Sequence, residues 1–340
     1  MKKVHVQDAV GLTLCHDVSA AYDGFCGVMF KRGHVIQPED VSRMLDNGKQ
    51  MVYVWEKCVA GEIHEDDAAV RLAEAAPVEG AHYEGPSQGS VTLYADRAGM
   101  FRVNTSMLQE LNAIEDVSIA ALPDHYPVQA GDRLAVMGIV PLLTAEAQVA
   151  KAEAICRGLP LMKLLPYQTR RVGIIITGSE FYHHRTEDKF NVIATEKLAN
   201  YPYELLGSAV CDDDPEMIVS AARRFLDDGA DLILISGGMN IDPDDLTPAA
   251  IRALGANVVG YGLPVRPGGM TLVAYLGKAA LLGIPGETVA APAGALDVLL
   301  PQIFAGVKFT AAELNTLGSG GLCLQCADGC RFPNCSFGRY

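Results

Sequence analysis

The alternation of apolar and polar residues changes character near residue 170. Before that point the apolar runs are short and mixed: 90–94 alternates as a half-buried strand does, and 65–75 carries apolar residues at helical spacing. Beyond it, fully apolar runs such as 172–176 and 232–235 alternate with segments of helical spacing. Fully apolar strands separated by helices are typical of a mostly parallel sheet covered on both faces. The sequence therefore predicts a doubly wound α/β domain in this part of the chain.

The same patterns predict the other elements and the division of the chain. In the α/β domain, strands are expected at 172–176, 203–210, 232–235, 257–261, 271–275 and 280–282, and helices at 188–200, 215–226, directly after Thr247 and at 288–304. This domain is expected over 166–306, preceded by two small α+β units at 1–60 and 61–165 and followed by a Cys-rich tail at 307–340. The tail from Leu317 shows no core of its own.

Composition and charge narrow the classes of protein. The chain has 340 residues, 49% of them hydrophobic and 20% charged, which excludes a disordered, collagenous or coiled-coil protein. Its formal net charge of −14 argues against nucleic acid and anionic membranes as partners. The first residues carry no apolar signal segment, and the apolar stretch at 280–307 is interrupted by prolines and acids. We therefore expect a cytoplasmic protein that does not enter a membrane.

Glycines and hydroxyl groups follow several of the predicted strands. Ligands of open α/β sheets bind beyond the carboxyl ends of the strands, and glycines there let backbone N–H groups approach a phosphate. Glycine after a strand is also ordinary turn chemistry, so each loop alone is weak evidence. Arg266, in the loop before the predicted strand 271–275, is a cation that could contact a phosphate. The residues expected to contact a ligand are Thr177, Gly178, Ser179, Ser236, Gly237, Gly238, Thr247, Arg266, Gly268, Gly283, Pro285 and Gly286.

The order and spacing of these loops resemble a known family. Residues 170–306 resemble the molybdopterin-binding domain shared by Mog-type adenylyltransferases and MoeA-type molybdotransferases of molybdenum cofactor biosynthesis. More weakly, 7–18 and 128–142 resemble the opening and the second domain of the molybdotransferases. The matching motifs are Thr177-Gly178-Ser179-Glu180, the Asp188 region, Asp212-Asp213-Asp214, Ser236-Gly237-Gly238, Asp245-Leu246-Thr247, Arg266-Pro267-Gly268 and Gly283-Ile284-Pro285-Gly286.

The resemblance implies a site for molybdopterin or its nucleotide form, with Mg²⁺ held by acidic residues. In that site Asp245, Glu180 and Asp188 would be the catalytic residues of a Mg-dependent transferase, a homo-oligomer that serves a molybdoenzyme client. The chain departs from the family pattern where Ser179 replaces an aspartate and where Arg266 and Gly269 replace two lysines. A carboxylate that would help to bind a metal is thereby lost. A molybdopterin carrier without turnover is the alternative, and Asp212–Asp214 read more simply as a solvated helix start.

Four of the nine cysteines are clustered near the carboxyl terminus. They form the pattern Cys323-x2-Cys326-x3-Cys330-x4-Cys335, whereas Cys15, Cys26, Cys58, Cys156 and Cys211 are scattered singly, as reduced thiols are. Short spacing lets thiolates converge on one metal, as in zinc sites or iron–sulfur clusters. The spacing leaves zinc and iron–sulfur both open, and a redox-active thiol tail is the alternative. A third interpretation of the whole chain is a metal-responsive interaction protein that works through this tail.

Overall fold

The computed structural model describes residues 1–22, 24–55 and 60–340, so Cys58 lies outside the described residues. Internal contacts divide the chain into two compact units. The first comprises Met1–Asp96, Val103–Leu122 and Gly131–Lys163; the second comprises Arg97–Arg102, Pro123–Ala130 and Leu164–Tyr340. Each unit is described by itself.

The first unit opens with a small mixed segment that has its own core. Strand β1 (Lys2–His5) pairs antiparallel with β4 (Met51–Val54), and β2 (Val18–Tyr22) pairs antiparallel with β3 (Phe25–Phe30). A 3-10 turn, η1 (Val6–Asp8), and helix α1 (Pro38–Asp46) complete the segment. Leu14, Ile36 and Met44 are fully buried between these elements.

The rest of the first unit is a four-stranded antiparallel sheet with three helices. The sheet order is β6-β7-β11-β9, and a two-stranded pair joins β5 and β12. Arg71 of helix α2 holds helix α4 through a bond from its Nε to Glu153 Oε1 at 2.7 Å. The element bounds are β5 Glu62–His64, α2 Glu65–Ala75, β6 Ala81–Ser87, β7 Ser90–Ala95, α3 Thr105–Asn112, β9 Val117–Ala121, β11 Arg133–Ile139, β12 Leu143–Ala145 and α4 Glu146–Cys156.

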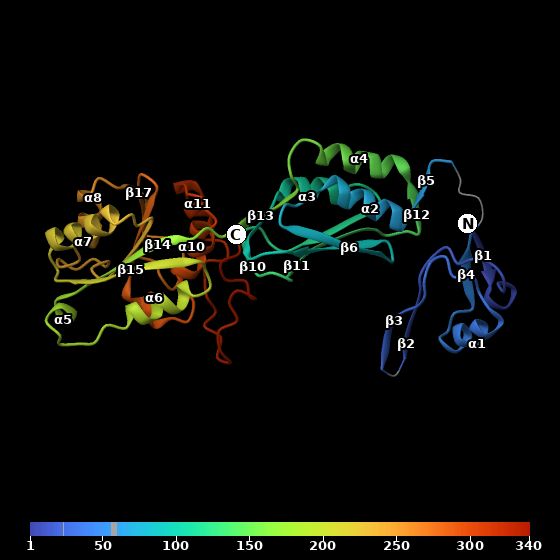
Figure 1. Ribbon diagram of the computed structural model, residues 1–340, viewed down its shortest axis with the longest axis horizontal. Coiled ribbons are helices and arrows are strands. Elements are labelled where there is room, and N and C mark those ends of the chain that lie inside the picture. Colours follow the sequence, from blue (N-terminus) through green and yellow to red (C-terminus); the bar gives the residue numbers. More distant parts are fainter. Residues whose placement is uncertain (23, 56–59) are drawn as a thin grey trace. The chain divides into compact units, whose positions relative to one another are not determined.

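The second unit is built on a six-stranded sheet of order β15-β14-β16-β19-β18-β17 (Figure 1). The strands β15, β14, β16 and β19 are parallel, and β18 and β17 join antiparallel at one edge. The predicted α/β class and the mostly parallel sheet are confirmed. The bounds are β14 Arg170–Thr177, β15 Tyr203–Cys211, β16 Leu232–Ser236, β17 Asn257–Tyr261, β18 Leu272–Leu276 and β19 Ala279–Ile284.

Alternate residues of the central strand β14 face two different cores. Val172, Ile174 and Ile176 lie in the core that includes helices α6 and α10, whereas Ile175 lies in the core of helices α7 and α8. A period of two along a strand places neighbouring side chains on opposite faces, so the sheet is covered on both sides. The helices are α5 Ser179–Tyr182, α6 Phe190–Leu198, α7 Pro215–Asp227, α8 Thr247–Ala253, α9 Gly286–Ala290, α10 Ala295–Phe304 and α11 Ala311–Thr316.

A smaller sheet of order β10-β8-β13 lies mostly in the second unit, with β8 Gly99–Val103, β10 Tyr126–Val128 and β13 Met162–Pro166. Its strand β10 touches the end of the chain. The Tyr126 hydroxyl donates to Asn334 Oδ1 at 2.7 Å, and the Arg339 guanidinium lies over the Tyr126 ring at 4.0 Å from its centre.

Two expectations are corrected. The helix expected at 288–304 is two helices, α9 and α10, because Pro292 and Gly294 interrupt it and Asp297 accepts the Gly294 N–H at 2.7 Å to start the second. The tail was expected to lack burial, yet Leu317 and Phe337, at 1% and 2% exposure, belong to the core of the α/β domain. Burial therefore holds both ends of the tail.

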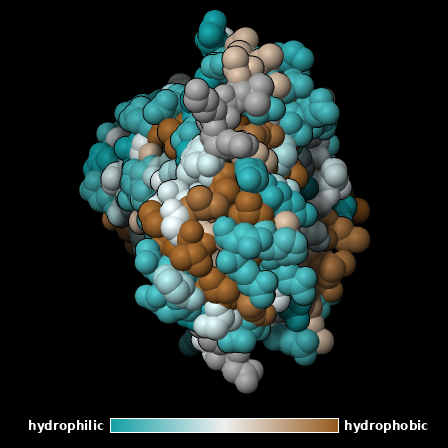
Figure 2. All heavy atoms as spheres, turned by 90° about the vertical axis from the view of Figure 1, so that its right-hand side faces the viewer, coloured by the Kyte–Doolittle hydropathy of each residue, from teal (hydrophilic) through white to brown (hydrophobic). Residues whose placement is uncertain are grey.

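The described residues include no helix able to span a membrane, but some of them expose large apolar side chains. Among the described residues no helix combines the length and apolar character needed to cross a bilayer. Large apolar side chains remain exposed in the first segment, namely Val10, Leu12, Phe25, Val35 and Leu45. Figure 2 shows hydrophobic atoms at the surface between hydrophilic ones.

Candidate functional site

Three parallel strands end side by side at one edge of the large sheet. The register pairs Ile176 of β14 with Ser236 of β16, and Ser236 with Ile284 of β19. The loops that follow these strands are distant in sequence, but the pairing brings them together. The predicted strand-end residues therefore share one edge, as expected for a parallel sheet.

Two buried threonines tie these loops to one another. Thr177 Oγ1 donates to the Ser236 carbonyl at 3.2 Å, and Thr247 Oγ1 donates to the Gly237 carbonyl at 2.8 Å. The two hydroxyl oxygens lie 3.5 Å apart, and both side chains are at most 2% exposed. In this arrangement the hydroxyls of Thr177 and Thr247 hold the loops in place rather than facing an open site.

The glycines of the edge fall into two kinds. Gly237 and Gly238 have φ of +97° and +56°; a Cβ on Gly237 would collide with the Thr177 carbonyl, and one on Gly238 would lie 2.9 Å from Thr247 Oγ1. A Cβ on Gly283 would lie 2.6 Å from Met239 Sδ. These three glycines permit close packing of the loops. At Gly286 a Cβ would meet nothing within 4 Å, so this position opens on free space.

The loop that carries Arg266 packs on the start of α9. Glu287 Oε1 accepts the N–H groups of Gly268 and Gly269, each at 2.7 Å. Arg266 Nη1 donates to the Val265 carbonyl at 2.9 Å and to the Leu263 carbonyl at 3.3 Å. A side chain on Gly269 would occupy the place of the guanidinium. The arginine expected to face a phosphate is therefore engaged with main-chain carbonyls of its own loop.

Among the residues that the structure describes, one buried polar atom beside this loop has no hydrogen-bond partner. It is Oγ1 of Thr288, which is 1% exposed and follows Glu287 in α9. A Cβ on Gly268 would lie 3.0 Å from this oxygen. Unpaired buried polar groups are uncommon in native proteins. The open position at Gly286 and this unpaired hydroxyl are the features of the edge that suit a small polar ligand.

The three acids expected to be catalytic are placed differently from one another. Asp188 accepts the N–H groups of Phe190 at 2.8 Å and Asn191 at 3.0 Å, so its carboxylate caps the start of α6. Asp245 Oδ2 accepts the Asp242 N–H at 2.8 Å, within its own loop. Glu180 is exposed. The described contacts of Asp188 and Asp245 therefore lie in two separate loops.

Asp213 is an acidic residue of this edge that the sequence analysis placed in a motif of the family resemblance but read more simply as part of a solvated helix start. Its Oδ2 accepts the Ser179 N–H at 2.9 Å, which ties the end of β15 to the end of β14. Burial raises the pKa of Asp213, and the nearby carboxylates of Glu180, Asp212 and Asp244 raise it further. Asp214 does cap a helix, since it accepts the Glu216 N–H of α7 at 2.8 Å. The position of Asp213 directly after a strand of the parallel sheet was the signal that could have identified it.

Metal binding stays a prediction in both places where it was expected. In the part of the chain that the structure describes, no three His, Cys, Asp or Glu side chains are placed to share one ion. The tail cysteines are all free thiols; Cys326 and Cys330 are exposed, and Cys323 and Cys335 are partly buried. Neither Mg²⁺ at the strand ends nor a metal in the tail is established by this geometry.

Together the sheet order and the glycine-rich strand ends define an open, mostly parallel α/β domain, a class of fold in which ligands bind beyond the carboxyl ends of the strands. Residues 173–305 match the family described as "Probable molybdopterin binding domain". Residues 3–56 match a second family, a domain of unknown function (DUF8806).

Curated relatives match parts of the chain. A "CinA-like protein" of Mycobacterium sp. (strain JLS) is 36% identical over 81 residues, 24% of this chain and 19% of that protein. A "Molybdopterin molybdenumtransferase" of Synechococcus elongatus is 27% identical over 157 residues, 43% of this chain and 38% of that protein. The chain thus spans well under two thirds of the length of these relatives.

Solved structures are similar to part of the chain. The molybdopterin biosynthesis enzyme MoaB from Thermus thermophilus is 26% identical, with a TM-score of 0.34 over 40% of this chain and 97% of that one. The molybdopterin biosynthesis Mog protein from Mycobacterium ulcerans is 23% identical, with a TM-score of 0.34 over 39% of this chain and 94% of that one.

Proposed function

We propose that the α/β domain binds molybdopterin or its nucleotide form at the carboxyl ends of β14, β16 and β19, and that the chain acts in molybdenum cofactor biosynthesis. The observation that carries the proposal is the family match of residues 173–305, which includes all three strand-end loops. The open position at Gly286 and the unpaired Thr288 hydroxyl support the placement of the ligand beside α9.

A cation accompanies the phosphate in this proposal. The carboxylates of Glu180, Asp213 and Asp244 lie close enough for the first and last to raise the pKa of Asp213. Such a group of acids repels a phosphate unless a cation lies between them. Mg²⁺ is the cation that we propose, because carboxylates and phosphate oxygens are its preferred ligands.

Binding and delivery is favoured over chemical transfer. Of the three acids that the resemblance assigns to catalysis, Asp188 accepts two backbone N–H groups of α6 and Asp245 accepts one within its loop. Ser179 stands where the family pattern has a carboxylate, and Arg266 is bound to carbonyls of its own loop. A carrier that performs no chemical transfer does not need these side chains to be free of internal hydrogen bonds.

The test adds a negative charge at the open glycine. Gly286→Asp suits the first turn of α9, where acids are favourable, but it repels a phosphate bound there. Gly158→Asp is the matched control, because Gly158 also has nothing within 4 Å of its Cβ position and no positive φ. We expect calorimetry with molybdopterin or an adenine nucleotide to show at least about tenfold weaker binding for Gly286→Asp, equal to about 1.4 kcal/mol, and no change for the control. Equal affinities in both variants contradict this placement.

The assembly and its client are also part of the proposal. We propose a homo-oligomer, since exposed apolar side chains of the first segment leave surface that association would cover. A sedimentation mass equal to the chain mass of 36.3 kDa contradicts it. The proposed client is a molybdoenzyme, and the proposed place of action is the cytoplasm.

A further inference from the structure

The tail that carries the four clustered cysteines is fixed at both ends. Near its start, the Arg266 N–H donates to the Gly321 carbonyl at 2.7 Å, and the Cys323 N–H donates to the Arg266 carbonyl at 2.9 Å. Near its end, Phe337 is 2% exposed in the domain core. The Gly338 N–H donates to the Gly320 carbonyl at 2.9 Å and brings the two ends together. Residues 321–337 therefore form a closed loop on the α/β domain.

The middle of this loop has little to hold it. Its main-chain hydrogen bonds are local, from Gly329 N to Cys326 O at 3.3 Å and from Asn334 N to Arg331 O at 2.7 Å. Leu324 is 75% exposed, so it contributes no core. Ordering a stretch of backbone costs conformational entropy, which these contacts hardly offset. Phe332 packs against the domain core and Asn334 accepts from the Tyr126 hydroxyl, so the part of the tail without such support is 324–331, whose residues are all exposed.

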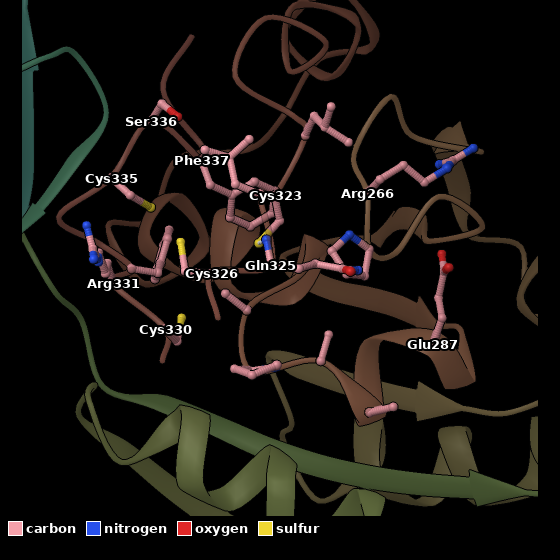
Figure 3. A pocket seen from close by; sticks show the side chains of 18 residues that line it. Arg266, Glu287, Cys323, Gln325, Cys326, Cys330, Arg331, Cys335, Ser336 and Phe337 are labelled. Carbon is pink, nitrogen blue, oxygen red and sulfur yellow. Dashed lines mark hydrogen bonds between the residues drawn. The ribbon is translucent and has the colours of Figure 1, made fainter. Parts of the chain in front are cut away.

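All four cysteines line one cavity of about 570 Å³, together with Arg266 and Glu287 of the α/β domain. Figure 3 shows Cys326, Cys330 and Cys335 on one side of this pocket and Arg266 and Glu287 on the other. The Gln325 N–H donates to Cys323 Sγ at 3.5 Å. Hydrogen bonds of this kind to sulfur stabilise thiolates in metal centres.

We propose that Cys323, Cys326, Cys330 and Cys335 bind one metal centre, a zinc ion or an iron–sulfur cluster, in this cavity. Four cysteine thiolates can hold either a zinc ion or an iron–sulfur cluster. Among the described residues no three of the thiols are placed to share one ion, so loading closes the segment 324–331 around the metal while the residues on either side stay in place. In small zinc peptides, metal–thiolate ligation is strong enough to fold the chain. The inference stands without the proposed pterin site.

The experiment uses the full chain, purified without oxygen and loaded with Zn²⁺ alone or with Fe²⁺, Fe³⁺ and sulfide. Elemental analysis should give about one zinc per chain, or about four irons and a broad visible absorption band for a cubane cluster. The double variant Cys326→Ser/Cys330→Ser should lose at least about nine tenths of the metal, because two of four ligands are removed. Cys26→Ser is the control, since Cys26 is an exposed free thiol outside the tail and should leave the metal content unchanged.

Amide hydrogen exchange distinguishes metal binding from misfolding. Because the residues on either side of 324–331 are held by burial and hydrogen bonds, the double variant should keep protection near Phe337 and lose it only at 324–331. Failure of the wild-type chain to load either metal, with all four tail thiols open to alkylation, overturns the proposal. Equal metal content in the double variant overturns it as well.

Discussion

The strand-end edge and the cysteine tail hold the candidate functional residues of this chain, but they are built in opposite ways. At the edge, nearly every polar group has an internal partner: Thr177 and Thr247 bond to neighbouring loops, and Asp213 bonds to Ser179. In the tail, the residues on either side of 324–331 are held, but 324–331 are exposed, Cys326 and Cys330 among them.

The strand-end edge has the properties of a preformed site, whereas the tail, in our proposal, is a site that its metal must complete. A site whose groups are already paired to each other offers a ligand a fixed shape and a few open positions. A loop whose donors are apart gains its structure from the ion that they bind. Substitutions at the edge should therefore damage the fold, and substitutions of the tail thiols should damage only metal binding.

Phe337→Ala gives the largest expected effect. The side chain is 2% exposed in the domain core, and replacing a buried phenylalanine by alanine costs about 3–5 kcal/mol. Chemical denaturation of the metal-free chain measures the loss. Leu324→Ala, at a position 75% exposed in the same tail, is the control and should change stability little. An unchanged midpoint for Phe337→Ala would mean that burial does not anchor the tail.

Gly237→Ala should come next. Its φ of +97° and the collision of a Cβ with the Thr177 carbonyl together cost about 2–4 kcal/mol. Urea unfolding measures the loss, and Gly286→Ala is the matched control because its Cβ meets nothing within 4 Å. Equal stability of the two variants would contradict the packed-edge description.

Asp188→Ala should cost about 1 kcal/mol, the usual effect of removing a side chain that caps a helix. The carboxylate accepts the Phe190 and Asn191 N–H groups at the start of α6. Thermal unfolding measures the cost, and Asp188→Asn, which keeps an acceptor oxygen, should restore most of it. If Asp188→Ala is neutral for stability yet abolishes a transfer reaction, the residue is catalytic and the carrier proposal is wrong.

The smallest effect is a pH dependence at Asp213. Its pKa is raised by burial and by neighbouring carboxylates, so the folded chain holds the proton more tightly than the unfolded chain does. The contribution of Asp213 to the free energy of unfolding is therefore greatest below the ordinary carboxyl pKa, and it falls as the pH rises through the raised pKa of Asp213. Asp213→Asn should flatten that fall in a series of denaturation curves at different pH values. The same slope in both proteins would show that another group titrates.

Much of the fold could be predicted from the chain alone. The apolar runs at 172–176 and 232–235 lie inside the observed strands β14 and β16, and 215–226 coincides with α7 to within its last residue. The error at 288–304 arose because apolar residues continue through Pro292 and Gly294, where the backbone leaves the helix. Each helix or strand that packs against a core has apolar residues at a regular spacing, and that spacing can be recognised within a short stretch of sequence.

The candidate site, like the fold, could be predicted only in part from the sequence. The order of the glycine-rich loops indicated the family whose model matches residues 173–305. It also indicated the edge of the sheet, because parallel strands bring their carboxyl ends together whatever the side chains do. Which side chain is open and which is already hydrogen-bonded was decided by the folded geometry, partly within a loop and partly between loops. Arg266 bonds to its own loop, Asp188 caps a helix, and Asp213 reaches across to Ser179. A hydrogen bond depends on atoms that meet in space, and no periodicity along the chain records where those partners lie.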